Sequence, residues 1–200
     1  MKLPESFYRR NDVVTISREL LGKYLFTCIN GIVTGGYIVE TEAYNGIIDK
    51  AAHSYGNRLT HRTKTMYMHG GVAYVYLCYG IHEMFNVVTA VEGEPKAILI
   101  RAIQPTDGTD IMLQRRKMNV IKPAITSGPG SVARALGISR DINAISLLSD
   151  TLWIEDRGMI IPDEAIAAVP RIGVAYAAED AQLPYRFYIK GNVYVSKPNK

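Results

Sequence analysis

The pattern of apolar and polar positions along this 200-residue chain predicts mainly short strands. Runs rich in β-branched and aromatic residues, bounded by Gly, Pro, Asn and Asp, are typical of strands. Because most of these runs follow one another without long helical stretches between them, we expect antiparallel pairing. The predicted strands cover residues 23–29, 32–42, 72–80, 84–91, 96–103, 152–155, 171–174, 186–190 and 193–195.

Two tight turns and three helices complete this pattern. Asn30-Gly31 is a strong signal for a two-residue hairpin, and Gly191-Asn192 predicts a second hairpin near the C-terminus. Asp12 is placed to cap a helix that Gly22 ends. The other helices are expected over residues 106–118 and 132–136. The amides at the start of the last helix either bind an anion or only close a capped turn, and the sequence favours neither reading.

The segment from residue 36 to residue 44 ends a predicted strand with two acids and a phenol. Alternation along a strand places Glu40, Glu42 and Tyr44 on one face, and Val39, Thr41 and Ala43 on the other. Carboxylates at a strand end are more often solvated than catalytic, so this segment alone predicts no chemistry.

The following residues add histidine and tyrosine to these acids. Residues 45–68 form a polar, aperiodic stretch that contains His53, and the next strand carries Tyr74, Tyr76 and Tyr79. Tyrosine at strand spacing usually packs against neighbours, and we expect this of Tyr74. Tyr79 precedes Gly80 at a predicted hairpin tip, where a large aromatic side chain would protrude into solvent.

Composition indicates one globular domain covering residues 1–200, with 48% hydrophobic and 21% charged residues. A net charge of +4 is compatible with a polyanionic partner but is too small to establish one. Two cysteines, Cys28 and Cys78, suggest reduced thiols in a cytoplasmic protein and are expected in the core. We expect neither a targeting leader nor a basic N-terminal extension, and no membrane association.

Several motifs in a fixed order resemble the alkyladenine (3-methyladenine) DNA glycosylase family. The resemblance covers nearly the whole chain, and the combination is far more specific than any one motif. The motifs are Glu40-Thr41-Glu42-Ala43-Tyr44, Ala51-Ala52-His53-Ser54, Tyr74-Val75-Tyr76, Tyr79-Gly80, Asn86, Leu99-Ile100-Arg101-Ala102, Pro105, Ser127-Gly128-Pro129, Arg171-Ile172-Gly173-Val174 and Arg186-Phe187-Tyr188.

This resemblance implies an α+β fold: a single compact domain on a curved antiparallel β core with flanking helices. It also implies a monofunctional hydrolase that uses no cofactor and acts on double-stranded DNA containing damaged purines, namely 3-methyladenine, 7-methylguanine or hypoxanthine. By the same resemblance, Glu42 is the general base that activates a water molecule, and Arg101 lies beside it.

The resemblance also implies how the damaged base is held. Tyr44, His53 and Tyr76 match the walls of a pocket for an extruded base, and Asn86 matches an asparagine on the pocket floor that disfavours guanine. Tyr79 matches the side chain that enters the duplex where the base has left.

One position departs from the family, and two other functions remain open. Ser131 stands where the family commonly has lysine, which should weaken one phosphate contact unless Arg134 compensates. The chain could instead be a lesion-binding protein without turnover, although the presence of both Glu42 and Arg101 argues against this. A metal-dependent hydrolase is the other alternative, and its ligands would be Glu40, Glu42, Asp49 and His53; the spacing of these residues does not favour it. Nothing in the sequence requires a partner chain, so we expect a monomer.

Overall fold

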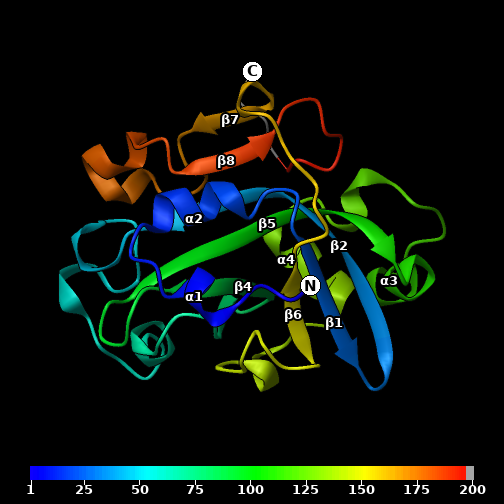
Figure 1. Cartoon of the computed structure of the whole chain (residues 1–200), viewed down its shortest axis with the longest axis horizontal. Coiled ribbons are helices and arrows are strands. Elements are labelled where there is room, and N and C mark those ends of the chain that lie inside the picture. Colours follow the sequence, from blue (N-terminus) through cyan, green and yellow to red (C-terminus); the bar gives the residue numbers. More distant parts are fainter. Residues whose placement is uncertain (197–200) are drawn as a thin grey trace.

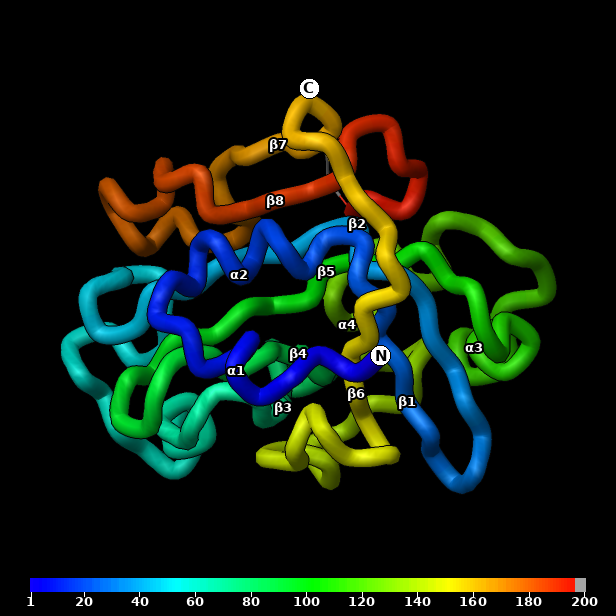
Figure 2. Tube along the Cα trace, in the orientation of Figure 1, coloured from blue at the N-terminus to red at the C-terminus, as the bar shows by residue number. Residues whose placement is uncertain are grey.

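The computed structural model describes residues 1–196, and its main feature is one curled antiparallel sheet of eight strands. Figures 1 and 2 show the β1–β2 hairpin extending from one end of the sheet, with α3 beside it. The order in the sheet is β3-β4-β5-β2-β1-β6, and β8 pairs with both β2 and β7. The strands are β1 (Tyr24–Ile29), β2 (Ile32–Tyr44), β3 (Ala73–Cys78), β4 (His82–Thr89), β5 (Lys96–Asp107), β6 (Leu152–Glu155), β7 (Ile166–Val169) and β8 (Arg186–Ile189).

The long central strand β2 exchanges partners halfway along one edge. Residues 32–37 pair with β1, residues 40–42 pair with β8, and the opposite edge pairs with β5. Ile38 pairs with Ile103 and Glu40 with Ala102, which leaves Val39 as an extra residue in β2. The next pair, Thr41 with Ile100, leaves Arg101 as an extra residue in β5. Two adjacent β-bulges therefore lie beside the acids of β2.

The bulge in β2 changes the side-chain alternation predicted for this segment. Glu40 and Glu42 do face the same side, because both contact Arg101. Val39, however, packs with Ala102 and Tyr188 in a cluster separate from the one that contains Ala43. The prediction that Val39 shares a face with Ala43 is wrong, because an extra residue in a strand interrupts its twofold alternation.

Short helices cover the sheet. The side chain of Asp12 accepts hydrogen bonds from the amides of Val14 and Thr15, which confirms it as the cap of α2. Helix α2 contacts β2, β5 and β8, and α4 contacts β2, β4 and β5. The α-helices are α1 (Glu5–Tyr8), α2 (Val13–Glu19), α3 (Thr109–Arg116) and α4 (Pro129–Leu136). The 3₁₀ helices are η1 (Gly46–Ile48), η2 (Tyr55–Asn57), η3 (Lys64–Tyr67), η4 (Pro123–Ile125), η5 (Arg140–Ile142), η6 (Asp163–Ala165) and η7 (Ala175–Gln182).

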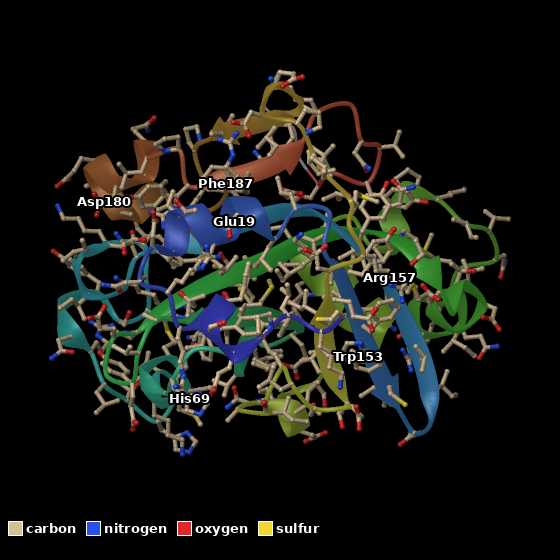
Figure 3. All side chains as sticks on the ribbon, viewed as in Figure 1. Glu19, His69, Trp153, Arg157, Asp180 and Phe187 are labelled. Atoms are coloured by element: carbon tan, nitrogen blue, oxygen red, sulfur yellow. The ribbon has the colours of Figure 1, made fainter. Side chains whose placement is uncertain are left out.

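The main hydrophobic cluster joins these helices to the sheet. Ile16 and Leu20 of the α2 region and Val132 and Leu136 of α4 are buried in it with residues of β1–β6 and β8. Outside this cluster, Trp153 of β6 stacks on Phe26, and Arg157 lies over the same Phe26 ring (Figure 3). The predicted α+β fold with a curved antiparallel core is confirmed.

Four local predictions differ from the structure. Residues 171–174 form a turn rather than a strand. Residues 193–195 do not pair, because the side chain of Asn192 bonds the amide of Tyr194 and the side chain of Gln104 instead. The helix expected from residue 106 begins at Thr109, since β5 continues through Asp107. Helix α4 begins at Pro129, three residues before the predicted start, and strand β7 was not predicted.

The two cysteines are free and half-buried, so the expectation that both fill the core is wrong. Cys28 lies next to the last residue of β1, close to the exposed hairpin turn. Cys78 is the last residue of β3. Within residues 1–196, no helix is long and apolar enough to cross a membrane.

Candidate active site

The register of three strands places two arginines around the two acids of β2. Glu42 pairs directly with Arg186 of β8, and the bulged Arg101 of β5 lies on the other side. The Nε atoms of Arg101 and Arg186 donate to Glu40 Oε1 at 2.9 and 2.8 Å. Arg101 Nη1 lies 3.3 Å from Glu42 Oε1. Both acids are fully buried and Arg101 is 7% exposed, so these charges interact in a medium of low dielectric constant.

Glu40 is held by more partners than Glu42. Besides the two arginines, it accepts hydrogen bonds from the backbone amide and the hydroxyl of Ser196. Arg101 Nη2 also donates to the Ser196 hydroxyl at 3.2 Å. Glu40 thus fixes the position of Arg101.

Among residues 1–196, Glu42 accepts one hydrogen bond on each carboxylate oxygen. The amide of Ile172 donates to Oε1 at 2.8 Å, and the hydroxyl of Tyr44 donates to Oε2 at 2.9 Å. Burial, followed by the negative charge of Glu42, raises the pKa of Tyr44 well above its ordinary value, so the phenol keeps the proton that it donates. The carboxylate is therefore oriented by two donors and faces the guanidinium of Arg101.

A buried ion pair holds the turn that supplies the Ile172 amide. Arg171 binds both oxygens of Asp49 and also donates to the carbonyl of Ala43 at 2.9 Å. Its guanidinium lies 4.9 Å from the centre of the Tyr44 ring. Residues 171–174 lie outside the sheet, and the pairing of Arg171 with Asp49 anchors this turn.

Four of the predicted binding residues line one small cavity next to these acids. Tyr44, His53, Tyr76 and Asn86 lie around a space of about 40 Å³. Ala51, Met66, Tyr74, Ala97 and Tyr176 complete its lining. Glu42 is not a lining residue, and Tyr44 joins the two parts, since its ring borders the cavity and its hydroxyl bonds Glu42.

His53 is neutral and held from both ring nitrogens. Arginine can only donate, so the 3.3 Å contact between Arg62 Nη2 and His53 Nε2 makes Nε2 the acceptor. Nδ1 then carries the proton and donates to the hydroxyl of Tyr74 at 3.0 Å. Burial and the nearby charge of Arg62 lower the pKa of His53 to about 4. The predicted packing role of Tyr74 is thus incomplete, because this residue also orients His53.

Aromatic rings form one wall of the cavity. The His53 and Tyr76 rings meet edge to face with centroids 4.7 Å apart, and the Tyr74 and Tyr76 centroids are 5.3 Å apart. Asn86 is 3% exposed and donates its side-chain amide to the carbonyl of Tyr74 at 3.2 Å. In the part of the chain that the structure describes, its Oδ1 accepts no hydrogen bond, which leaves an acceptor available beside the cavity.

Tyr79 lies apart from the cavity, in the turn between β3 and β4. It is 89% exposed and has a φ of 50°, followed by Gly80 at 73°. The predicted protruding aromatic side chain at a hairpin tip is confirmed. Ile81 in the same turn is 72% exposed, so two large apolar side chains project from this hairpin.

A wide hollow rich in cationic side chains begins at the same turn. It has a volume of about 740 Å³, and its lining includes Ile81, Ser131 and three arginines, Arg115, Arg116 and Arg134. These arginines donate to backbone carbonyls, and within residues 1–196 none of them forms an ion pair with an acid. Glu83 also lines the hollow and pairs with Arg140, so the three arginines leave the hollow with a net positive charge.

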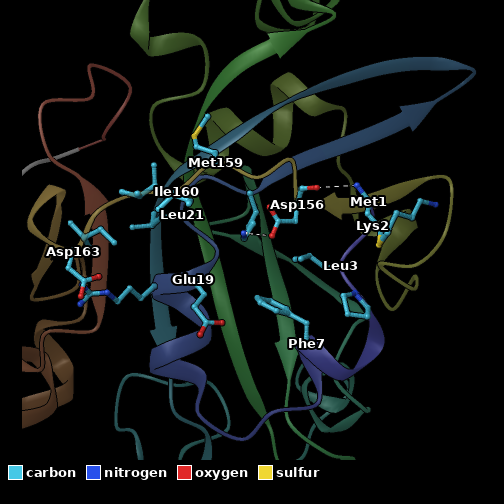
Figure 4. A pocket seen from close by; sticks show the side chains of 15 residues that line it. Met1, Lys2, Leu3, Phe7, Glu19, Leu21, Asp156, Met159, Ile160 and Asp163 are labelled. Atoms are coloured by element: carbon cyan, nitrogen blue, oxygen red, sulfur yellow. Dashed lines mark hydrogen bonds and ion pairs between the residues drawn. The ribbon is translucent and has the colours of Figure 1, made fainter.

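A second wide hollow, of about 600 Å³, lies between the N-terminal segment, α2 and the residues that follow β6 (Figure 4). Its charged side chains neutralise one another, as in the pairs Lys23–Asp156 and Arg18–Asp163. None of the predicted site residues lines it.

Each candidate metal ligand binds a partner within the protein. Glu40 and Glu42 bind arginines, Asp49 binds Arg171, and His53 bonds Tyr74. Among the described residues, no group of three or more His, Cys, Asp or Glu side chains is arranged to hold a metal ion.

Several contributing residues were not singled out from the sequence. Arg62 and Tyr176 lie in segments without a clear periodicity, Asp49 was considered only as a metal ligand, and Arg171 was assigned to a strand. Arg171 and Ile172 belong to one of the motifs of the resemblance. That motif does not predict that the Ile172 amide donates a hydrogen bond to Glu42.

Comparison with known proteins points to one family. The model of the methylpurine-DNA glycosylase family matches residues 6–193. A relative from Chlamydia felis (strain Fe/C-56) is 47% identical over 196 residues, covering 98% of both chains. One from Bacillus cereus (strain AH820) is 46% identical over 209 residues, covering 98% of this chain and all of the relative. Both bear the name "Putative 3-methyladenine DNA glycosylase".

Proposed function

The chain belongs to the methylpurine-DNA glycosylase family, enzymes that hydrolyse N-glycosyl bonds in DNA repair, and from this premise we propose that it excises alkylated or deaminated purines with a water molecule activated by Glu42. The substrates are 3-methyladenine, 7-methylguanine and hypoxanthine in double-stranded DNA. The observation that carries the proposal is the buried Glu42 carboxylate, which faces Arg101 and is joined through Tyr44 to an aromatic cavity.

In the proposed reaction, water attacks the anomeric carbon of the damaged nucleotide. The water oxygen forms a bond to this carbon, the water gives a proton to Glu42, and the bond to the purine nitrogen breaks with its electron pair on the base. A positioned carboxylate base contributes about 10²–10⁴-fold to such a step. The negative charge of Glu42 also stabilises the positive charge that develops on the sugar. Arg101 balances the buried carboxylates and helps to hold the attacking water.

The aromatic cavity is the proposed site of the extruded base. Tyr44, Tyr76 and His53 present rings to a purine, and stacking on an aromatic side chain contributes about 1–3 kcal/mol per base. Alkylation of a ring nitrogen makes the purine cationic, which adds a cation–π attraction and improves the leaving group. Asn86 on the floor disfavours guanine, whose exocyclic amine needs space and a partner there.

Tyr79 is the proposed wedge in the duplex. Extruding a nucleotide costs a few kcal/mol, and a side chain that fills the vacated space offsets part of this cost. The exposed position of Tyr79 at the end of the β3–β4 hairpin suits this role. The neighbouring arginine-rich hollow would contact the phosphate backbone.

The reaction as proposed needs no cofactor, and the enzyme acts as a monomer in the compartment that contains the DNA. The test is single-turnover release of free base from one duplex containing hypoxanthine and from a methylated duplex, with and without a chelator. Base release that is unaffected by the chelator supports the proposal. Binding of both duplexes without release would favour a lesion-binding protein, and loss of release in chelator would favour a metal-dependent hydrolase.

A further inference from the structure

The cavity proposed for the purine is too small for a purine in this structure. Its volume of about 40 Å³ corresponds to about three water molecules, since a cavity needs about 10–15 Å³ for each. Pockets that hold a whole organic ligand are of the order of 300–1,000 Å³. Some side chain at the entrance must therefore move before a base can enter.

Arg62 occupies the surfaces that a base would need. Its guanidinium carbon lies 4.7 Å from the centre of the Tyr76 ring, one of the rings that line the cavity. Its Nη2 also donates to His53 Nε2, the one ring nitrogen of that histidine that can accept a hydrogen bond. One exposed side chain thus contacts two residues of the cavity wall and takes up the acceptor nitrogen of one of them.

The position of Arg62 is that of an outer cover. A further hollow of about 450 Å³, called the outer hollow below, shares His53 and Tyr176 with the cavity. Its lining also includes Arg62, Arg58 and Lys50. Arg62 therefore borders a hollow that lies against the cavity on the side of His53 and Tyr176.

The backbone around Arg62 is held without its side chain. The hydroxyl of Thr63 donates to the carbonyl of Arg58, and Thr60 and Thr63 bond each other through amides and hydroxyls. Thr63 is buried, whereas Arg62 is exposed. The loop can therefore stay in place while the Arg62 side chain leaves the Tyr76 ring.

We propose that Arg62 is a gate residue: in the base-free protein its guanidinium occupies the Tyr76 face and His53 Nε2, and an extruded purine must displace it from both. This inference rests on the proposed function, because it takes the cavity as the purine site. The displaced guanidinium turns into the outer hollow, and binding of a base is weakened by the contacts that Arg62 gives up.

Removal of the gate should strengthen binding of a free purine. We would titrate 2-aminopurine, as the free base and without DNA, into wild type, Arg62→Ala and Lys64→Ala, and follow the His53 ring signals by NMR. For Arg62→Ala the dissociation constant should fall about two- to fivefold, the range that corresponds to one exposed cation–π contact. Lys64→Ala removes one cation from the same segment, and its dissociation constant should equal that of wild type.

If Arg62 only stabilised the cavity wall, Arg62→Ala would disturb the cavity, and the dissociation constant for 2-aminopurine would rise instead of falling. Equal or weaker binding by Arg62→Ala would overturn the gate. If the base binds neither protein at the His53 ring, both the gate and the assignment of the cavity are wrong. The glycosylase activity itself is judged separately, by release of base from damaged duplexes by wild type.

The midpoint of the His53 titration gives a second readout in the same samples. Loss of the Arg62 charge should raise this midpoint in Arg62→Ala and leave it unchanged in Lys64→Ala. An unchanged midpoint in Arg62→Ala would show that the guanidinium does not lie against His53 in solution, which would also overturn the gate.

Discussion

Glu42 is buried more completely than a group that meets water usually is, and its surroundings explain how that burial is tolerated. It accepts hydrogen bonds from the Ile172 amide and the Tyr44 hydroxyl, and Arg101 lies 3.3 Å away. A buried charge costs little when it is paired and hydrogen-bonded. In the proposed mechanism, the same burial would strengthen the field that Glu42 exerts on a sugar cation, because solvent would not screen it.

His53 should stay neutral through the physiological pH range. Its pKa of about 4 lies below the value of 6.5 in an unfolded chain, because burial and Arg62 disfavour the imidazolium ion. Below pH 6.5 the unfolded chain therefore takes up a proton that the folded protein does not. The free energy of unfolding should fall as the pH drops from about 6.5 to about 4, and this contribution should not change above pH 6.5.

NMR titration of the His53 ring measures this directly, and a midpoint near 6.5 would contradict the buried, neutral histidine. His53→Gln is the matched variant for stability, since its side chain does not titrate. Comparison of its denaturant unfolding with that of wild type between pH 4 and 7 should show a smaller pH dependence in the variant.

The strands were more predictable than the connections between them. Asn30 and Gly31 have positive φ values of 55° and 75°, so a local signal was enough to predict the β1–β2 hairpin. The bulges at Val39 and Arg101 depend on the register between β2 and β5, which no local pattern contains. The Arg171 turn likewise depends on Asp49, more than a hundred positions away in the chain.

In the site, too, local motifs were predictable and contacts between distant segments were not. The ordered motifs named Glu42, Tyr44, His53, Tyr76 and Asn86, and the fold brings all of these except Glu42 to one cavity. Sequence reasoning could not show that Arg62 contacts Tyr76 and His53 of the cavity wall, because an arginine in a polar loop is normally solvated. The contact depends on where the loop folds back on β3.

The ion pair between Asp49 and Arg171 should matter for both stability and activity. Both side chains are almost fully buried, so Asp49→Ala leaves an unpaired buried cation and should cost about 3–5 kcal/mol of unfolding free energy. Denaturant unfolding measures this loss.

A double variant separates stability from positioning. Arg171→Met with Asp49→Leu removes both charges, and such replacements are often neutral or stabilising. We expect it to recover most of the stability lost in Asp49→Ala. Its excision rate should remain low, because the turn that directs the Ile172 amide at Glu42 has lost its anchor. Full activity in the double variant would show that this ion pair has no positioning role.

Across the molecule, the features proposed to contact DNA follow the β3–β4 hairpin. Tyr74 and Tyr76 line the cavity, Tyr79 projects from the turn, and the arginine-rich hollow begins at Ile81. Ser131 lines that hollow together with Arg134, at the position where the resemblance described above implies a lysine. The Arg134 Nε donates to the carbonyl of Arg115, so this side chain is partly committed within the protein.

Ser131→Lys should restore one phosphate contact and strengthen binding to duplex DNA. The plot of log binding constant against log salt concentration should become steeper by about 0.9 for one added contact. Ser6→Lys adds the same charge on α1, which contributes no residue to this hollow, and should leave the slope nearly unchanged. Equal slopes for wild type and Ser131→Lys would place the DNA backbone away from this hollow.

The role of Glu42 is tested most directly by single-turnover excision with the Glu42→Gln variant, on a duplex that contains hypoxanthine. Glutamine keeps the size of the side chain but cannot accept the proton of the attacking water. We expect the excision rate to fall by about 10²–10⁴-fold, while binding of the same duplex is retained. Excision at the wild-type rate would contradict the mechanism and show that another group activates the water.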